Sequence, residues 1–285
     1  MKKTIKLINE YIEAEINLIG AELISIAKIQ QNNLLWVKNE QYWNRVAPIL
    51  FPIVGKLKDD SYRINDKRYS MKQHGFARDL EFKVVEQTTN KVELILVETK
   101  ETRKHYPFSF SLSVEYKLVG QSIQIFYKTI NTGKEMLPYS VGGHPGFEIN
   151  LPIENYKLNF YKSFISDRWK IIDGLYSEET EKMIIDGYLS LTKDLFMHDA
   201  IVFKRPPFSK VTLENNQSEK IVTLGSENWE AIGLWTKPGA PFFCIEPWWG
   251  WADNQNASGD LLQKSGIHYL EPSKSEIVSY YIEVH

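Results

Sequence analysis

The sequence predicts an all-β fold, mainly a large antiparallel β-sandwich with few short helices. One observation is that apolar and polar residues alternate along most ordered segments, which is the period of a half-buried strand. Another is that many short strand candidates, separated by turn residues, fill the 285 residues, whereas helical candidates are few. Because no linker rich in Pro, Gly or Ser divides the chain, we expect a single domain over residues 1–285.

The first half of the chain carries several strand candidates. Residues 11–37 alternate, with Gly20 as a turn or bulge. Residues 62–71 predict a hairpin that turns at Asn65-Asp66. Three further candidates complete this half: residues 92–98, 109–119 and 122–130. The last two are separated only by Gly120-Gln121, which predicts a hairpin with a tight connection.

The second half is less regular. Four segments are predicted as strands: residues 210–213, 231–236, 242–246 and 275–284. Lys193–Phe196 predicts a single helical turn. Residues 167–192 follow neither the strand nor the helix period, which predicts a short helix or a long loop there.

Composition and charge limit the partners. The 34 basic and 36 acidic residues give a formal net charge of −2, and no basic run indicates nucleic acid or an anionic membrane. The one cysteine, Cys244, can form no internal disulfide, so we expect a reducing, cytoplasmic location. No apolar stretch is long enough to span a bilayer, and the N-terminus lacks the apolar region of a signal peptide.

Three short motifs place an ionisable side chain among glycines, prolines and aromatic residues. They are His74-Gly75-Phe76-Ala77-Arg78, Gly142-Gly143-His144-Pro145-Gly146-Phe147 and Ile245-Glu246-Pro247-Trp248-Trp249-Gly250. They lie so far apart in the sequence that only a large folded scaffold can bring them together. Histidine and carboxylate side chains are typical of proton transfer near neutral pH. Aromatic rings pack well on the apolar faces of sugars, which suggests a sugar as the ligand.

Each ionisable residue has a functional and a structural interpretation. The glycines that flank His144 have little bulk and let a ligand approach its ring, which favours a functional role. The alternative is a structural histidine that is hydrogen-bonded to the backbone of a tight turn. For His74 and Arg78 the two interpretations are even: Arg78 can bind a ligand oxygen or pair with a neighbouring acidic residue on the surface. Glu246 is expected to end a buried strand, where burial raises its pKa for a general base; a buried ion pair is the alternative.

Other residues are secondary candidates. Three tryptophans cluster after Glu246, and Trp248 and Trp249 can line a cleft or pack in the core. Asp199 stands at the entrance of an expected strand, where it can accept hydrogen bonds from sugar hydroxyls or simply end a turn. Arg45 can line a cleft or pair on the surface.

Several other chemistries are not indicated. The chain has no glycine-rich phosphate loop and no nucleophile elbow. No two histidines have the close spacing of a helical or strand metal site, and nothing specific favours a distributed site of His74, His144 and Glu246. We therefore expect neither a cofactor nor a metal.

Five stretches, in order along most of the chain, give a specific resemblance. They are Arg45–Gly55, His74–Arg78, Tyr106-Pro107-Phe108, Gly143–Phe147 and Glu246–Gly250. With them the chain resembles the aldose 1-epimerase (galactose mutarotase-like) superfamily, in particular its LacX-like branch, which is related to the hexose-6-phosphate mutarotases. The resemblance implies a large β-sandwich with an open sugar-binding cleft, and cofactor-free interconversion of α and β anomers.

The resemblance also implies roles for individual residues. His144 would be the general acid that protonates the ring oxygen, and Glu246 the general base that takes the proton of the C1 hydroxyl. The substrate-binding residues would be His74, Arg78, Arg45, Asp199 and Trp248. The two arginines fall where the hexose-6-phosphate relatives use arginines near the substrate.

The substrate is less defined than the chemistry. Galactose mutarotases proper carry a longer Asn-Arg-rich motif where this chain has Leu50–Gly55, which leaves galactose and a hexose phosphate both open. We expect a small sugar as the partner, and the oligomeric state is open, a homodimer included. Two alternatives to a mutarotase are a non-catalytic carbohydrate-binding or sensing protein on the same fold, and a glycoside hydrolase that uses Glu246 with Asp199.

Overall fold

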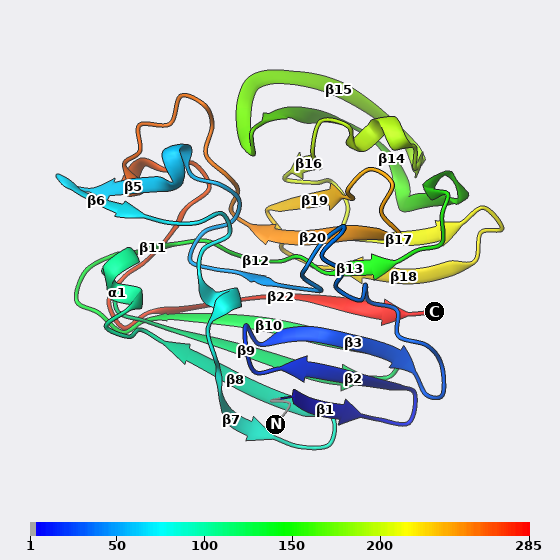
Figure 1. Cartoon of the computed structure of the whole chain (residues 1–285), viewed down its shortest axis with the longest axis horizontal. Helices are drawn as coiled ribbons and strands as arrows, with labels where there is room; N and C mark the ends of the chain where they lie inside the picture. Colours follow the sequence, from blue (N-terminus) through cyan, green and yellow to red (C-terminus); the bar gives the residue numbers. More distant parts are fainter. Residues whose placement is uncertain (1–3) are drawn as a thin grey trace.

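The computed structural model describes residues 4–285, so residues 1–3 of the expected domain lie outside it. Its largest sheet has nine antiparallel strands in the order β15 (Leu175–Ser190), β14 (Tyr156–Ile172), β17 (Lys210–Asn215), β18 (Lys220–Gly225), β22 (Ser275–Val284), β10 (Ser122–Asn131), β9 (Phe110–Val119), β8 (Lys91–Val97) and β7 (Lys83–Gln87). A six-stranded sheet has the order β16 (Ile201–Lys204), β19 (Ala231–Trp235), β20 (Phe242–Trp249), β12 (Val141–Gly143) and β4 (Ile49–Leu50), with β13 (Gly146–Glu148) also paired to β20. The fold is the predicted antiparallel sandwich (Figure 1).

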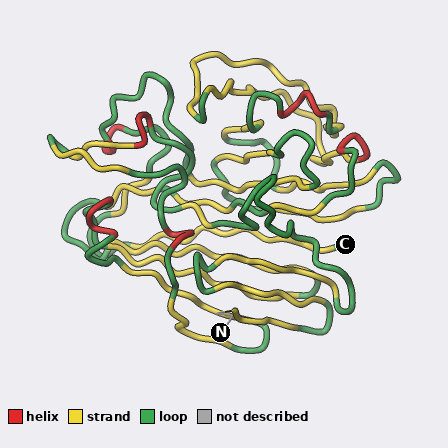
Figure 2. Tube along the Cα trace, viewed as in Figure 1, coloured by secondary structure: helices red, strands yellow, loops and turns green. Residues whose placement is uncertain are grey.

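Smaller elements surround these two sheets. The strands are β1 (Thr4–Ile8), β2 (Ile12–Asn17) and β3 (Glu22–Lys28) in one sheet, the pair β5 (Ser61–Ile64) and β6 (Lys67–Ser70), and the pair β11 (Leu137–Tyr139) and β21 (His268–Leu270). The helical segments are α1 (Thr102–His105) and the 3-10 turns Lys58–Asp60, Ala77–Asp79, Ile153–Asn155, Lys193–Phe196 and Leu261–Gln263. Figure 2 shows how little of the chain is helical, as predicted. No helix among residues 4–285 has the length and apolar character needed to cross a bilayer.

Strong alternation in the sequence marks the strands that form where predicted. β10 is buried at every second residue, and Val119 pairs with Ser122 across the predicted Gly120-Gln121 turn. The hairpin of β5 and β6 turns at Asn65-Asp66, with Asn65 at a φ of 51°. Because one face of these strands meets the core and the other meets polar surroundings, the period of two is visible in the sequence.

The prediction for residues 167–192 was wrong. Instead of a short helix or a loop, they belong to the long hairpin of β14 and β15, which turns at Asp173-Gly174. Much of this hairpin is exposed on both strands, including the charged run Glu178–Lys182. A strand that meets solvent on both faces has no apolar face and therefore no alternation to read. In Figure 1 the hairpin, here called the arm, arches over β16 and β19.

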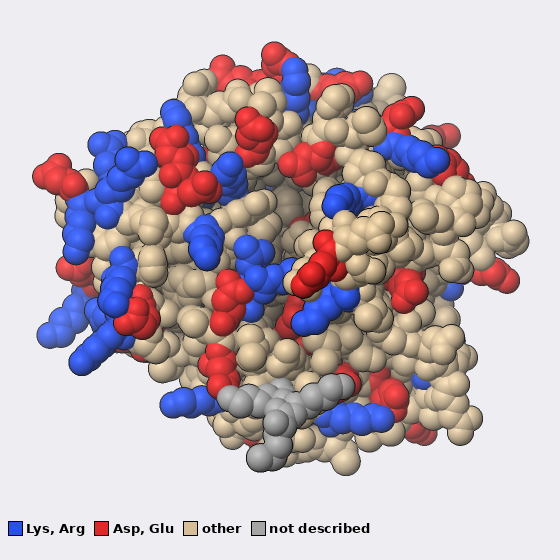
Figure 3. Space-filling model, in the orientation of Figure 1, with Lys and Arg blue, Asp and Glu red and all other residues tan. Residues whose placement is uncertain are grey.

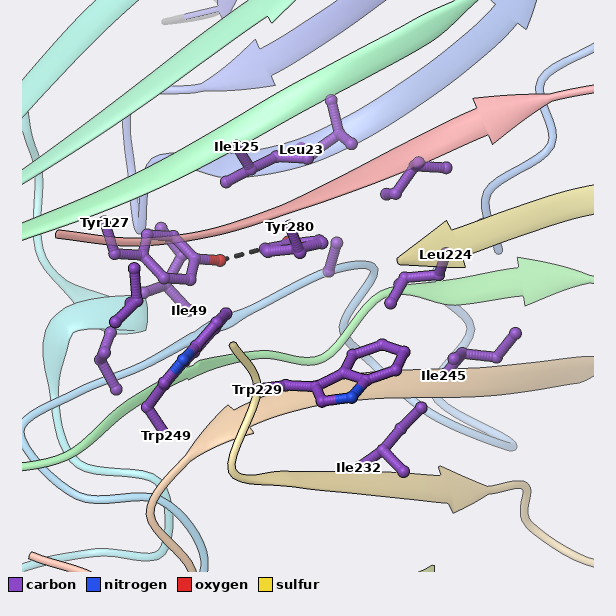
Figure 4. Packing of buried hydrophobic residues seen from close by; sticks show 14 of the residues in the cluster. Leu23, Ile49, Ile125, Tyr127, Leu224, Trp229, Ile232, Ile245, Trp249 and Tyr280 are labelled. Atoms are coloured by element: carbon purple, nitrogen blue, oxygen red, sulfur yellow. Dashed lines mark hydrogen bonds between the residues drawn. The ribbon is translucent and has the colours of Figure 1, made fainter. Parts of the chain in front are cut away.

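The main core lies between the two large sheets. Figure 4 shows Ile125, Tyr127 and Tyr280 of the nine-stranded sheet opposite Ile245 and Trp249 of β20. These residues belong to one buried apolar cluster that also takes in the sheet of β1, β2 and β3. Aromatic side chains that bury a polar end need a partner, and Tyr127 and Tyr280 share a hydrogen bond of 3.2 Å. The core thus holds the inner face of β20 rigid, and with it the residues on the strand's other face.

A partly buried ion cluster joins His268 of β21 to Glu276 of β22 and to Glu230, which directly precedes β19. His268 Nε2 lies 3.1 Å from Glu230 Oε2, and its Nδ1 lies 3.2 Å from Glu276 Oε2. Burial alone lowers the pKa of His268, but the two carboxylates outweigh it and raise the pKa to about 9. The imidazole is therefore charged at neutral pH and bridges two acidic side chains.

Replacing His268 with Gln is expected to destabilise the protein in a pH-dependent way. The folded pKa lies above the unfolded value, so the stabilisation is fully present below about pH 6.5 and is lost as the pH rises through about 9. The thermal midpoints of wild type and variant should differ most near pH 6 and converge near pH 10. His198→Gln, at an exposed position, is the control substitution. A His268 effect that is constant across this range would contradict the argument.

Candidate functional site

His144 and Glu246 are brought together by strand pairing. β12 and β13 both pair with β20, with Gly142 opposite Trp248 and Gly146 opposite Cys244. The same register places His144 opposite Glu246, so that their side chains lie on one face as cross-strand neighbours. His144 Nε2 and Glu246 Oε2 are 3.1 Å apart.

Glycines allow this close packing. A Cβ on Gly142 would lie 2.9 Å from the Trp248 ring, and one on Gly233, which pairs with Glu246 from the other side, would lie 2.7 Å from the same ring. A side chain at either position would push Trp248 away from the strand pair. The glycines around His144 and Glu246 therefore serve the placement of the indole.

His74 reaches the same place through the backbone. It has a φ of 65° and is followed by Gly75 at 69°, a left-handed pair that few residue types adopt. Gly75 bridges to Phe51, next to β4, and β4 pairs with β12. As a result the His74 and His144 rings are 5.6 Å apart, edge to face.

A cleft of about 330 Å³ lies over these three residues. Of the residues singled out from the sequence, six line it: His74, Arg78, His144, Asp199, Glu246 and Trp248. The other lining residues are Trp43, Gly55, Gln73, Ile171, Gly174, Tyr176, Ala200, Trp235 and Ala252. The face seen in Figure 3 is hollowed near its centre and carries both signs of charge around the hollow.

The His144–Glu246 pair is buried, and burial governs its ionisation. Burial, assisted by the positive charge of Arg78, lowers the pKa of His144 to about 3. Burial, followed by the negative charge of Asp199, raises the pKa of Glu246 well above its usual range. Burial therefore favours the neutral form of each group, the carboxylic acid of Glu246 and the neutral imidazole of His144.

His74 is held as a neutral hydrogen-bond donor. The Gly55 N–H donates to its Nδ1 at 3.1 Å, which leaves the proton on Nε2. Burial, together with His144 and then Arg78, lowers the pKa of His74 well below its usual value. Its role in the cleft is thus confined to donating one N–H.

Buried polar atoms without a partner gather in this cleft. Within residues 4–285 there are four such side-chain atoms: Arg78 Nε, His144 Nδ1, Glu246 Oε2 and Trp248 Nε1. The contact of Glu246 with His144 is close but lacks the alignment of a hydrogen bond. All four residues line the cleft. Because leaving such groups unsatisfied costs about 1–3 kcal/mol each, their clustering indicates a polar ligand with several hydrogen-bonding groups.

The two arginines separate in the structure. Arg78 lines the cleft, and its Nη2 donates to the Gln73 carbonyl at 2.6 Å. Arg45 does not line it: its Nη2 lies 2.6 Å from Asp79 Oδ1, and both side chains are partly exposed. The surface pairing considered for Arg78 is thus made by Arg45. Arg45, proposed from the sequence as a substrate-binding residue, lies outside the cleft lining and bonds the Arg78 carbonyl and Asp79 in the turn that carries Arg78.

Trp248 and Trp249 point to opposite faces of one strand. The sequence predicted that this strand ends at Glu246. In the structure β20 continues to Trp249, because its inner face stays buried along its whole length. Strand alternation places Trp248 beside Glu246 in the cleft. Trp249 faces the core and donates from Nε1 to the Asn228 carbonyl at 2.7 Å.

Residues 3–265 match the family model described as aldose 1-epimerase. The chain belongs to the aldose 1-epimerase family. Two curated relatives in this family are the chromosomal and plasmid LacX proteins of Lactococcus lactis subsp. lactis, 32% and 31% identical, each over 99% of both chains. The resemblance predicted from the motifs is thereby confirmed.

Solved structures agree with this family assignment. A galactose mutarotase related enzyme from Lactobacillus acidophilus has a TM-score of 0.94 at 32% identity, covering 99% of this chain and 97% of that one. A galactose mutarotase-like protein from Lactobacillus casei has a TM-score of 0.94 at 28% identity, covering 99% and 100%. The fold of this aldose 1-epimerase family member is therefore the galactose mutarotase-like sandwich.

Two residues of the site were missed in the sequence. Trp43 stacks on His144 with ring centres 4.8 Å apart, and Trp235 meets it edge-on at 5.7 Å. Gly146 makes room for this stack, since a Cβ there would lie 2.8 Å from Trp43. Trp235 lies near the end of a predicted strand, residues 231–236, and Trp43 lies in a loop. Neither has a local signal that points to a histidine about a hundred residues away.

The described residues bring one set of possible metal ligands together. His144, Cys244 and Glu246 each offer an atom, all within 4.8 Å of one another. This set differs from the His74, His144 and Glu246 group considered above. Cys244 is fully buried and does not line the cleft, and burial raises the pKa of its thiol well above the usual value. A thiol held in this way disfavours the thiolate that a metal requires.

Proposed function

We propose that this protein is a mutarotase that interconverts the α and β anomers of a hexose or hexose phosphate. The observation that carries the proposal is the buried pair of His144 and Glu246, 3.1 Å apart, in a cleft lined by unsatisfied polar atoms. Membership of the aldose 1-epimerase family supports an isomerase. The cleft volume, about 330 Å³, lies at the small end for ligand sites and suits one sugar ring.

The proposed reaction moves two protons and breaks one bond. Glu246, as the carboxylate, takes the proton of the C1 hydroxyl while the bond between C1 and the ring oxygen breaks. His144, as the imidazolium, gives its proton to the ring oxygen. Rotation about the C1–C2 bond turns the aldehyde, and the reverse transfers close the ring on the other face. The enzyme ends with the protons it began with.

The ionisation of the free pair fits this cycle. Carboxylic acid with imidazole and carboxylate with imidazolium differ only by the position of one proton, and the facing atoms are 3.1 Å apart. The neutral form is the one that follows ring opening, and the charged form is the one that starts it. Sugar hydroxyls that donate to Glu246 would stabilise its carboxylate and so shift the pair to the starting form.

Other lining residues would hold the ring. His74 would donate from Nε2 near the ring oxygen, and Trp248 from Nε1. Arg78 carries an unpartnered Nε that suits an oxygen acceptor. Asp199 would accept hydrogen bonds from ring hydroxyls at the cleft rim.

The direct test is to add the purified protein to a pure sugar anomer and follow the anomeric proton signals by NMR. We expect acceleration over buffer for at least one hexose or hexose phosphate. No acceleration for any common hexose or hexose phosphate would overturn the proposal. Saturable sugar binding without anomer exchange would instead select a carbohydrate-binding protein.

The pH dependence of kcat/KM offers a second prediction. Burial lowers the pKa of His144 to about 3 and raises the pKa of Glu246 well above its usual range. Since kcat/KM reports the free enzyme, we expect it to fall only below the His144 value and above the raised pKa of Glu246. The measurement is the enzymatic rate after subtraction of the buffer rate at each pH. A rise in kcat/KM through about pH 4.3, the ordinary value of a glutamate, would contradict it.

A further inference from the structure

Two arginines stand directly opposite each other on the hairpin of β5 and β6. Arg63 pairs with Arg68 in the antiparallel register, so both side chains project from the same face of the hairpin. Among residues 4–285, neither arginine takes part in an ion pair. Like charges that face each other in this way repel and weaken the strand pairing. The hairpin therefore keeps an unfavourable contact that an anion would relieve.

A hollow of about 260 Å³ lies beside this pair, and we call it the hairpin hollow. Three basic residues line it: Lys58, Arg63 and Arg68. Asp59 is the one acidic residue in the lining, so the hollow has an excess of two positive charges. Figure 3 shows basic side chains gathered at the left of this face, where Figure 1 places β5 and β6. The charge of the hollow thus favours an anionic ligand.

Hydrogen bonds position both guanidinium groups at the hollow. Arg68 Nε donates to Ser61 Oγ at 2.9 Å, and Arg63 Nη2 donates to the Ser258 carbonyl at 2.9 Å. Each bond engages one nitrogen of its guanidinium, and the other two nitrogens have no acceptor among residues 4–285. Because the guanidinium is a planar fork of donors, a fork fixed at one nitrogen presents its remaining N–H groups in a set direction. The two forks are therefore ready to bind ligand oxygens.

A second hollow, of about 280 Å³, adjoins the hairpin hollow. The two share four lining residues, which are Tyr62, Ala257, Ser258 and Gly259. The second hollow adds amide and hydroxyl groups from Asn254, Asn256, Gln263 and Ser265. Neither hollow shares a lining residue with the cleft of His144 and Glu246. The two hollows therefore form a separate candidate site with one basic end and one polar end.

We infer that the hairpin hollow binds a phosphate group, either free or carried on a small ester. A phosphate has close to two negative charges at neutral pH, which matches the charge excess of the lining. Its oxygens accept paired hydrogen bonds from guanidinium forks, and its charge offsets the repulsion between Arg63 and Arg68. The alcohol part of an ester would lie in the adjoining polar hollow. Since both hollows lie outside the cleft, this inference is independent of the proposed mutarotase function.

The test is calorimetric titration of the purified protein with inorganic phosphate, at an ionic strength held constant with sodium chloride. We expect saturable binding with a Kd of about 1 mM or lower. Arg68→Gln should raise this Kd at least about tenfold, because it removes one positive charge and charge-assisted hydrogen bonds. Lys67→Gln is the matched control and should leave the Kd unchanged. Lys67 is an exposed cation on the same strand, projects from the opposite face and does not line the hollow.

A cleft variant separates the two locations at which phosphate could bind. Arg78→Gln removes the arginine of the cleft and should leave the Kd for phosphate unchanged. Loss of binding in Arg78→Gln, with binding retained in Arg68→Gln, would place the phosphate in the cleft and overturn the inference. Absence of saturable binding to the wild type, or equal effects of Arg68→Gln and Lys67→Gln, would overturn it as well.

Thermal stability gives a second readout that does not depend on calorimetry. Phosphate should raise the midpoint of the wild type by more than that of Arg68→Gln, because only a ligand of the folded state stabilises it. An equal rise in both proteins would contradict the inference. If Arg68→Gln does not fold, Arg63→Gln takes its place in both experiments. Glycerol 3-phosphate then distinguishes the two sources of the phosphate group: a Kd below that of inorganic phosphate selects an ester, and an equal Kd selects free phosphate.

Discussion

Replacing Glu246 with Gln is expected to lower kcat/KM for anomer exchange by about 10²–10⁴-fold, the usual contribution of a positioned acid or base. The amide keeps the shape of the side chain but cannot take up the proton of the C1 hydroxyl. His144→Ala should cause a loss of similar size, because it removes the group proposed to give its proton to the ring oxygen. The measurement is the initial rate of approach to anomeric equilibrium, by NMR or polarimetry.

The control for Glu246→Gln lies on the same strand and face. Cys244→Ala removes a buried side chain two residues away that does not line the cleft, and it should leave kcat/KM within about twofold. Glu246→Gln should also keep or raise the thermal midpoint, since the buried carboxyl has an unpartnered oxygen. Full activity in the variant would remove Glu246 from the proposed role.

Replacing Gly75 with Ala is expected to destabilise the protein by about 3 kcal/mol or more, a severe effect for one methyl group. A Cβ at this position would lie 2.2 Å from the Phe51 carbonyl oxygen and 2.5 Å from its carbon. Both are backbone atoms at the end of β4, so neither can rotate away. The left-handed φ of 69° adds its own strain. The measurement is the free energy of unfolding in urea, together with the yield of folded protein.

Gly187→Ala is the control that separates the effect of the Cβ contact with Phe51 from the effect of a left-handed backbone. Gly187 has a φ of 75°, close to that of Gly75, but nothing lies within 4 Å of a Cβ there. Only the left-handed strain applies, which costs about 1–2 kcal/mol. Equal losses at the two positions would show that the contact with Phe51 is unimportant.

How much of the fold the sequence predicts depends on what each strand faces. The β9–β10 hairpin and β22 meet the core on one side only, so their alternation gave both the strands and the turn. Much of the arm is exposed on both of its strands, and its position is set by backbone hydrogen bonds and by the contact of Lys204 with Trp169 and Tyr176. Such contacts join distant segments and leave no local period.

The candidate site divides in the same way. His144 and Glu246 could be singled out from their neighbours in the sequence. His144 is flanked by glycines, and Glu246 follows a run of apolar residues. The structure places the two side chains in contact. The partners of Arg45 and Arg78 were open, because each arginine could line a cleft or pair with an acidic residue on the surface. Only the fold shows that Arg45 pairs with Asp79. The rings that enclose His144 come from segments without any motif.

The two parts of the site differ in how firmly the fold holds them. His144 and Glu246 stand on paired strands whose inner face is closed by the core, whereas the arm, which lends Ile171, Gly174 and Tyr176 to the cleft lining, is an edge hairpin that is largely solvated. Local opening should therefore reach the arm far more often than the strands that carry His144 and Glu246. Substitutions in the arm can accumulate without unfolding the centre of the molecule. Evolution could then change which ligands this face admits while the His144–Glu246 pair stays the same.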